Sequence, residues 1–280
     1  MPTPGRSKRH VERARMIEPE DMTEVTQGMS RNLFDVAGKT ALVTGGTSGI
    51  GAMIAHGLHE HGARVVIAGR KQPALDAAEA GGLMAIQADL STTEGCRELA
   101  EKVADRVNGL DILVNNAGAT WGAPLDEFPD SAWSRVLDLN VRAPFVLTQA
   151  LLPMLERTAT ADVPSRVVMI GSIDGIRVPR TASYSYSASK AAIHQLTRHL
   201  ARDLSERHVT VNAIAPGPFE SRMMAPILKD LRAEIEAAAP LGRIGRPDDM
   251  VGAVVYLASR AGSYLTGTVI PVDGGIATTL

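Results

Sequence analysis

The stretch that decides the fold is Thr44-Gly45-Gly46-Thr47-Ser48-Gly49-Ile50-Gly51, which follows the apolar run Ala41-Leu42-Val43 and precedes a helical pattern. Glycines at this spacing allow a tight turn, a close approach of backbone to a pyrophosphate, and close packing of the next helix on the strand. The start of that helix offers unpaired N–H groups and a positive dipole end to an anion. Such turns also occur without a ligand, but the place between a first strand and a helix favours a dinucleotide site. The predicted contact residues are Gly45, Thr47, Ser48, Gly49, Ile50 and Gly51.

On either side of this loop, short β-rich runs alternate with segments of helical length. The predicted strands are 40–44, 64–69, 84–89, 111–115, 166–172, 210–215 and 268–272, and the predicted helices are 49–61, 94–107, 131–155, 184–206 and 248–259. Most of the strands are nearly continuous in apolar residues, as strands covered on both faces are. The alternation indicates parallel strands joined by right-handed crossovers. We therefore predict an α/β fold with one doubly wound, Rossmann-like domain over residues 36–280.

Composition excludes several classes of protein. The 280 residues hold 29 Lys and Arg against 31 Asp and Glu, a formal charge of −2, which disfavours a general nucleic-acid binder. Cys96 is the single cysteine, so neither an intrachain disulfide nor a thiolate metal cage is possible, and we predict no metal. No run of 18 apolar residues is present, and Met1 to Arg15 lack the apolar stretch of a signal peptide. We therefore expect a cytoplasmic protein without a membrane partner.

Residues 1–35 differ from the rest of the chain, because basic and acidic groups follow one another without an apolar period. We expect a mobile N-terminal tail. Two alternatives stay open: Met22 or Met29 marks the usual start, or the basic arm Arg6–His10 touches a partner.

The choice of cofactor is predicted at the end of the second strand. Arg70 and Lys71 stand there, 19 residues after Gly51, where a carboxylate would accept a hydrogen bond from a ribose 2′-hydroxyl and repel a 2′-phosphate. The basic pair favours NADP(H) over NAD(H), and a solvated basic turn is the alternative. At the end of the third strand we predict a contact with the adenine amino group, and at the end of the fourth strand we predict the floor of the crevice. For the asparagine pair of that floor, plain turn chemistry is the alternative. These residues are Asp89, Leu90, Asn116, Ala117 and Gly118.

Four residues form a candidate hydride-transfer site. Tyr186 and Lys190 lie at i and i+4 on one helical face, Ser172 ends the fifth strand, and Asn140 lies in the preceding long helix. Reduction of a ketone needs a proton donor for the developing alkoxide, and we expect the ammonium to lower the phenol pKa from about 10. Ser172 can donate to the substrate oxygen, and Asn140 can hold a water that links Lys190 to solvent. Each residue alone also fits an ordinary structural role.

With these motifs the chain resembles the short-chain dehydrogenase/reductase family from about Gly38 to Gly275. The resemblance rests on Thr44–Gly51, Asn115-Asn116-Ala117-Gly118, the tetrad Asn140, Ser172, Tyr186 and Lys190, and Pro216-Gly217. It implies a seven-stranded sheet in the order 3-2-1-4-5-6-7 and a homotetramer, with a homodimer as the alternative. It also implies that Pro216, Gly217 and Phe219 contact the nicotinamide side of the cofactor. One departure is Ser48, where relatives that prefer NADP often carry Arg or Lys.

Within the family, the runs 118–123 and 214–223 most resemble the NADPH-dependent 3-oxoacyl reductases of the rhamnolipid type. The resemblance implies a substrate lid at about residues 218–246, whose apolar residues fit an acyl chain or plain core equally well. Those residues are Phe219, Met223, Met224, Ile227 and Leu228. Trp121, Asp174 and Arg177 are candidates for the pocket lining, and Arg157 and Arg207 for docking of an acidic carrier protein.

Three functions are therefore compared. The first is an NADPH-dependent carbonyl reductase that converts 3-oxoacyl thioesters, on acyl carrier protein or CoA, to 3-hydroxyacyl products. The second is the same chemistry on a sugar acid, steroid or other secondary alcohol. The third is a nucleotide-sensing scaffold without turnover, which has no need of the complete tetrad.

Overall fold

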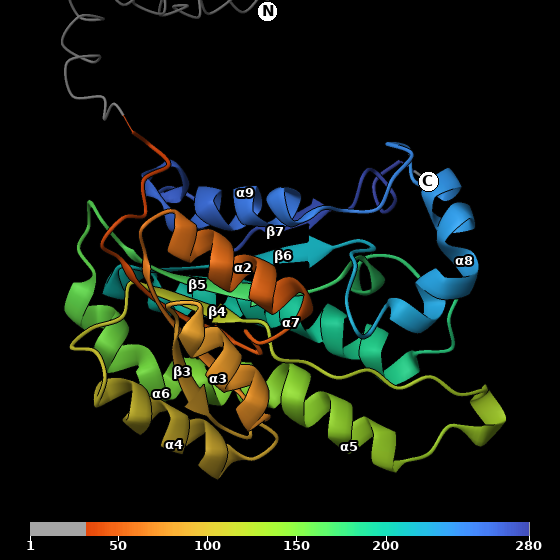
Figure 1. Cartoon of the computed structure of the whole chain (residues 1–280), viewed down its shortest axis with the longest axis horizontal. Coiled ribbons are helices and arrows are strands. Elements are labelled where there is room, and N and C mark those ends of the chain that lie inside the picture. The colour runs from red at the N-terminus through yellow and green to blue at the C-terminus, as the bar shows by residue number, and fades with distance from the viewer. Residues whose placement is uncertain (1–31, 280) are drawn as a thin grey trace, which may run out of the picture. The chain divides into compact units, whose positions relative to one another are not determined.

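Seven parallel strands form the centre of the structure, in the spatial order β3-β2-β1-β4-β5-β6-β7 (Figure 1). Their bounds are β1 Thr40–Thr44, β2 Arg64–Gly69, β3 Met84–Gln87, β4 Ile112–Asn115, β5 Ser165–Ile170, β6 Val209–Pro216 and β7 Val269–Val272. The computed structural model of the chain describes residues 32–279. All seven predicted strands are found within a few residues of their predicted ends. The doubly wound sheet and its order are thus confirmed.

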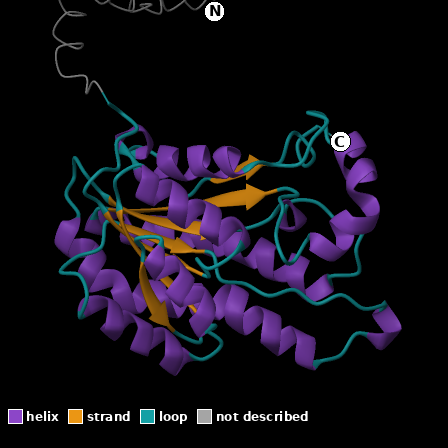
Figure 2. Ribbon diagram, in the orientation of Figure 1, coloured by secondary structure: helices purple, strands orange, loops and turns teal. Residues whose placement is uncertain are grey.

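Helices cover both faces of the sheet, as the apolar strands require (Figure 2). In β2, for example, Val65 and Ile67 pack on one side and Val66 and Ala68 on the other. The first side is covered by α2 Gly49–Glu60, α3 Gln72–Ala80 and α9 Pro247–Ala258, and the second by α4 Thr93–Ala104, α6 Ala143–Thr158 and α7 Tyr184–Leu204. Each strand therefore contributes to two apolar cores, and its carboxyl end is left to face solvent or a ligand.

Three helical segments differ from the prediction, one of them α8 Ala225–Ala238, which was expected only as part of a lid. The single helix expected over 131–155 is instead α5 Ser131–Leu137, a π-helical turn Asp138–Arg142, and α6. A π turn inserts an extra residue, a change that hydrophobic periodicity does not reveal and that often marks a functional site. Helix α3 was not predicted, because its nine residues bury only Leu75 and Ala78.

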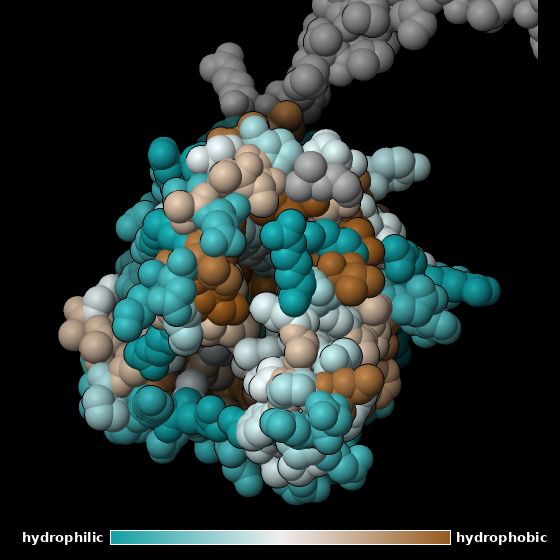
Figure 3. All heavy atoms as spheres, turned by 90° about the vertical axis from the view of Figure 1, so that its right-hand side faces the viewer, coloured by the Kyte–Doolittle hydropathy of each residue, from teal (hydrophilic) through white to brown (hydrophobic). Residues whose placement is uncertain are grey.

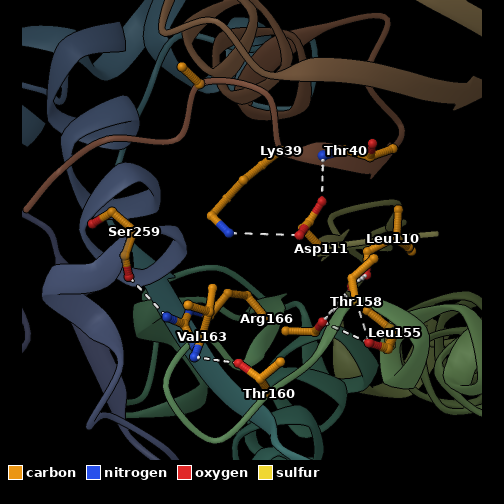
Figure 4. Close-up of polar contacts among 12 residues, drawn as sticks. Lys39, Thr40, Leu110, Asp111, Leu155, Thr158, Thr160, Val163, Arg166 and Ser259 are labelled. Atoms are coloured by element: carbon orange, nitrogen blue, oxygen red, sulfur yellow. Dashed lines mark hydrogen bonds and ion pairs between the residues drawn. The ribbon is translucent and has the colours of Figure 1, made fainter.

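The amino edge of the sheet is joined by polar contacts (Figure 4). The Asp111 carboxylate accepts a 2.8 Å hydrogen bond from the Thr40 amide and lies 3.7 Å from the Lys39 ammonium. Arg166 of β5 is 2% exposed and donates to the carbonyl of Ser259 at 3.1 Å. These contacts tie β1, β4, β5 and the end of α9 together, on the side away from the cleft described below.

The predicted N-terminal tail falls almost wholly on residues 1–31, which lie outside the described part of the chain, and its role stays a prediction. Residues Phe34–Leu280 form one compact unit. Among residues 32–279, no helix combines the length and apolarity needed to cross a bilayer.

Candidate active site

A cleft of about 910 Å³ opens at the carboxyl edge of the sheet. It includes the ends of β1 and β4, between which the order of the strands reverses. Figure 3 looks onto this edge and shows a hollow with hydrophobic side chains beside it. In doubly wound sheets this reversal is where ligands bind. The 16 residues named above as cofactor contacts all line this one cleft, and so do Tyr186 and Lys190, which were predicted to bind the cofactor as well as to act in catalysis.

The glycine-rich loop has the shape that an anion site needs. Gly45 adopts φ +66°, a conformation that favours glycine, and a Cβ on Gly51 would lie 2.3 Å from the Gly45 carbonyl oxygen. Helix α2 then begins with no side-chain hydrogen bond from its N-cap Ser48 and no acidic residue in its first turn. Its first N–H groups and its dipole are therefore free to meet a phosphate.

The loop after β4 is tied to the end of β1. The hydroxyl of Thr44 accepts hydrogen bonds from the amides of Asn116 at 2.9 Å and Ala117 at 3.0 Å, and the Asn116 side chain donates to the Thr44 carbonyl at 2.8 Å. Asn115 points elsewhere, because it is buried and its amide donates to Thr148 at 3.2 Å. Only the second asparagine of the pair belongs to the crevice.

The far end of the cleft carries the predicted basic pair. Arg70 and Lys71 are both exposed and line the cleft beside Asp89 and Leu90. Hydrogen bonds from Ser91 lower the pKa of Asp89, and the positive charge of Arg70 lowers it further. A cationic end joined to an anion-binding loop fits a cofactor that carries a phosphate beyond its pyrophosphate.

Tyr186, Lys190 and Ser172 meet at the opposite end of the cleft. The Lys190 ammonium lies 5.5 Å from the centre of the Tyr186 ring and donates to the Ile170 carbonyl at 2.7 Å. Ser172 follows β5, and its hydroxyl accepts a 3.1 Å hydrogen bond from the Asp174 amide. Three members of the predicted tetrad are thus brought together around one space.

Asn140, the fourth member of the predicted tetrad, lies in the helical segment where it was expected. It is buried in the π-helical turn and does not line the cleft. Its side-chain amide exchanges two hydrogen bonds with the backbone of Ala119, at 2.7 and 2.9 Å, and donates to Ser189 at 2.9 Å. The Ser189 hydroxyl in turn donates to the Tyr186 carbonyl at 2.6 Å. The side chain therefore connects the loop after β4 to α7, and the role of Asn140 in holding a water that links Lys190 to solvent stays a prediction.

The predicted direction of the tyrosine pKa shift is wrong for the chain by itself. Burial raises the pKa of Tyr186 to about 12, against a hydrogen bond with Ser172 that lowers it, and the charge of Asp174 adds to the rise. Burial also lowers the pKa of Lys190 to about 8. Desolvation of the half-buried phenol outweighs the hydrogen bond with Ser172. The phenol is accordingly protonated at neutral pH, the state that donates a proton to a carbonyl oxygen.

Two of the three predicted substrate residues line the cleft. Asp174 and Met223 do so, together with Arg177. Burial raises the pKa of Asp174, and the charge of Arg177 opposes that rise. Trp121 lies outside the lining, since its ring contacts the guanidinium of Arg135, which is 5.4 Å from the ring centre. The place of Trp121 shortly after a strand end did not show whether its side chain faces the cleft.

Helix α8, Ala225–Ala238, supplies one wall of the cleft. Ile227, Leu231 and Ile235 recur every four residues and all face the cleft. Leu231 remains 42% exposed, so this stripe is not plain core. Among the predicted lid residues, Phe219, Met224 and Ile227 also line the cleft, and Leu228 does not. Phe219 is in addition buried against Gly245 at the base of the segment.

Sequence reasoning missed several lining residues. The spacing of the α8 stripe was a signal available in the sequence, whereas the loop residues have no local pattern that marks them. The missed residues include Thr120, Gly122, Pro179, Arg180, Thr181, Ser183, Leu231, Glu234, Ile235, Ala238 and Ile276.

The arginines predicted to dock a carrier protein lie far from this cleft. Arg157 donates to the carbonyl of Asn108 at 2.9 Å, and Arg207 pairs with Glu156 at 3.1 Å. Asn108 precedes β4 and Arg207 precedes β6, which places both arginines at the amino edge of the sheet. Docking of a carrier protein by these two arginines stays a prediction.

Comparison with known proteins gives concordant matches. The family model described as enoyl-(acyl carrier protein) reductase matches residues 45–277. The chain is 50% identical to the rhamnolipids biosynthesis 3-oxoacyl-[acyl-carrier-protein] reductase of Pseudomonas aeruginosa, over 86% of this chain and 97% of that protein. It is 34% identical to the 5-keto-D-gluconate 5-reductase of Escherichia coli, over 88% and 98%. Its structure resembles the Pseudomonas aeruginosa RhlG/NADP active-site complex with a TM-score of 0.85 and 47% identity, covering 89% of this chain and all of the other.

Proposed function

The chain belongs to the short-chain dehydrogenase/reductase family, and on this basis we propose that it reduces 3-oxoacyl thioesters to 3-hydroxyacyl products with NADPH. The observation that carries the proposal is the apolar stripe of α8 on the wall of the cleft that holds Ser172 and Tyr186. An acyl chain gains about 0.8 kcal/mol for each CH₂ that it buries on such a wall. A small, strongly hydrated substrate gains nothing from it.

Each residue of the site has its own role in the reaction. When bound, NADPH supplies the hydride. The Ser172 hydroxyl donates to the carbonyl oxygen of the substrate and holds it next to Tyr186, which gives its proton to the developing alkoxide. The Lys190 ammonium stabilises the phenolate that this leaves behind. Helix α2 and the exposed Arg70 hold the phosphates of the cofactor.

A sugar-acid substrate is the second candidate. It is favoured by the 34% identity to the 5-keto-D-gluconate 5-reductase and by Arg177 and Arg180, which line the cleft and are able to pair with a carboxylate. The non-catalytic scaffold is disfavoured, because a binding module has no need of a half-buried Tyr186 paired with a buried Lys190 beside a serine.

The deciding experiment is a substrate panel with NADPH and the purified protein. Acetoacetyl, 3-oxooctanoyl and 3-oxodecanoyl thioesters on CoA and on acyl carrier protein are compared with 5-keto-D-gluconate at equal concentrations. We expect kcat/KM to rise about fivefold or more from the four-carbon to the eight-carbon thioester, because extra CH₂ groups reach α8. A preference for the keto acid, or no effect of chain length, would contradict the proposal.

The assembly and the location of the protein stay predictions. A homotetramer, with a homodimer as the alternative, is supported by exposed aromatic side chains around α9, since exposed apolar patches commonly mark interfaces. Phe34 and Tyr256 stack with ring centres 6.3 Å apart, and Tyr264 is fully exposed. Light scattering of the purified protein tests the assembly, and cell fractionation tests the cytoplasmic location.

A further inference from the structure

Gly171 and Gly175 flank the turn that carries Ser172, and because they have no side chain this turn packs closely against α7. A Cβ on Gly175 would lie 2.6 Å from the backbone carbonyl carbon of Lys190 and 2.7 Å from the amide nitrogen of Ala191. A Cβ on Gly171 would lie only 2.2 Å from the Nε2 atom of His194. The turn therefore rests on helix backbone at one end and, at the other, on the His194 side chain and less closely on the Ile214 carbonyl oxygen, 3.2 Å from such a Cβ.

That side chain, His194, has no part in the chemistry described above. It lies one helical turn after Lys190 and is 4% exposed. Among the described residues, its Nε2 atom is buried without a hydrogen-bond partner, a situation that costs about 1–3 kcal/mol. An aliphatic side chain would fill the space without this cost, so the flat ring must serve another purpose.

The ring contacts both ends of the turn. It meets Gly171 directly before Ser172 and forms a hydrogen bond with the backbone of Gly175, three residues after it. Burial, followed by the charges of Lys190 and Arg198, lowers the pKa of His194 to about 4. The imidazole is thus a neutral spacer at physiological pH.

We infer that His194 is a positioning residue, which sets the distance between the turn that carries Ser172 and the helix that carries Tyr186 and Lys190. The serine comes from the end of β5 and the tyrosine from α7, so only the contact between these two elements fixes their relative places. A misplacement of about 1 Å in such a site can reduce the rate a hundredfold. The inference rests on the proposed reductase activity but on no particular carbonyl substrate.

The first test is a double-mutant cycle between His194→Ala and Ser172→Ala. We expect His194→Ala to lower kcat about tenfold, while KM for the carbonyl substrate and the Kd for NADPH, measured by fluorescence, stay within about twofold. When Ser172→Ala is already present, we expect His194→Ala to have no further effect on kcat, because His194 acts only by placing the Ser172 hydroxyl. Additive effects on kcat would overturn the inference, and so would a loss that lies in KM alone.

The second test uses the steric contact. Gly171→Ala pushes a methyl group into the imidazole and is expected to lower kcat about tenfold or more, whereas Gly171→Ala with His194→Ala returns to the level of His194→Ala alone. Gly252→Ala in α9 is the matched control, since its Cβ would meet nothing within 4 Å. If the double variant stays as slow as Gly171→Ala, the imidazole is not the spacer.

A third measurement does not depend on turnover. Crystal structures of the wild type and of His194→Ala are expected to differ in the distance from Ser172 Oγ to the Tyr186 hydroxyl, and an unchanged distance would overturn the inference. A wild-type protein that reduces no carbonyl contradicts the proposed function, whereas an active enzyme with an additive cycle contradicts only the role of His194.

Discussion

The Lys190 ammonium lies 5.5 Å from the centre of the Tyr186 ring, and its nearest partner is the carbonyl of Ile170 at 2.7 Å. Both side chains project from α7 into the cleft, one helical turn apart. Burial raises the pKa of the phenol to about 12 and lowers the pKa of the ammonium to about 8. The pair therefore keeps a transferable proton on Tyr186 at neutral pH, and it does so with a buried cation that the folded state tolerates poorly.

This buried cation predicts how stability depends on pH. Between pH 8 and 10.5 the folded chain releases the Lys190 proton while the unfolded chain still holds it, so the unfolded state binds more protons and wild-type stability rises with pH. Lys190→Met lacks this contribution. We expect the free energy of unfolding of the wild type to rise by about 3 kcal/mol relative to Lys190→Met across that range. Urea titrations at several pH values measure it.

The control for that experiment is Lys229→Met, which removes an exposed lysine on α8. Its unfolding curve should follow the wild type at every pH. If the free energy of unfolding changes with pH in the same way for the wild type and Lys190→Met, burial does not lower the pKa of Lys190 in the folded protein.

Tyr186→Phe tests the proton donor. The change deletes one hydroxyl and keeps the ring, so we expect the rate of carbonyl reduction to fall by about 10²–10⁴-fold. NADPH binding, followed by fluorescence, should stay within about threefold of the wild type. Tyr184→Phe is the matched control, because Tyr184 is 40% exposed, does not line the cleft, and has Ala188 at i+4 instead of a lysine. Substantial activity in Tyr186→Phe would exclude the phenol as donor.

The parts of the site that the sequence predicted are those set by local spacing. Tyr186 and Lys190 share a helix face because they are four residues apart, and the loop glycines are fixed by the strand before them and the helix after them. The parallel sheet then brings the strand-end Ser172 to the same edge. These relations follow from helix and strand geometry alone, and the structure confirms that the residues meet.

The parts that could not be predicted depend on which elements enclose a side chain. The rise in the Tyr186 pKa comes from burial by the surrounding turn and helix, which no spacing reveals. The engagement of Asn140 with Ala119 depends on a π turn that adds one residue to an otherwise regular helix. Trp121 lies next to the cleft in sequence but turns toward Arg135, a contact set by tertiary packing.

The basic pair at the end of β2 predicts the cofactor preference. Arg70→Asp replaces a cation, which can pair with a 2′-phosphate, by a carboxylate, which can accept from a ribose 2′-hydroxyl. A charge-assisted hydrogen bond contributes about 1.5–3 kcal/mol. We therefore expect kcat/KM for NADPH to fall about 100-fold and kcat/KM for NADH to rise. Steady-state kinetics with both cofactors measure the ratio.

Lys71→Ala provides the comparison, because it removes the neighbouring charge and leaves Arg70 in place. We expect Lys71→Ala to lower kcat/KM for NADPH by no more than about fivefold. An unchanged preference in Arg70→Asp would assign the recognition of the 2′-phosphate to other residues of the cleft.

The stripe on α8 predicts how the enzyme distinguishes acyl chains. Leu231→Glu places a charge in the middle of the apolar wall formed with Ile227 and Ile235. Loss of one buried leucine contact is worth about 1.5–3 kcal/mol, so kcat/KM for a 3-oxodecanoyl thioester should fall by about tenfold or more. For acetoacetyl thioester, whose chain ends near Ser172, kcat/KM should fall by less than about twofold. Ala233→Glu introduces the same charge into the same helix at an exposed position that does not line the cleft, and should leave both rates unchanged. Equal losses for the short and the long chain in Leu231→Glu would show that α8 does not contact the acyl group.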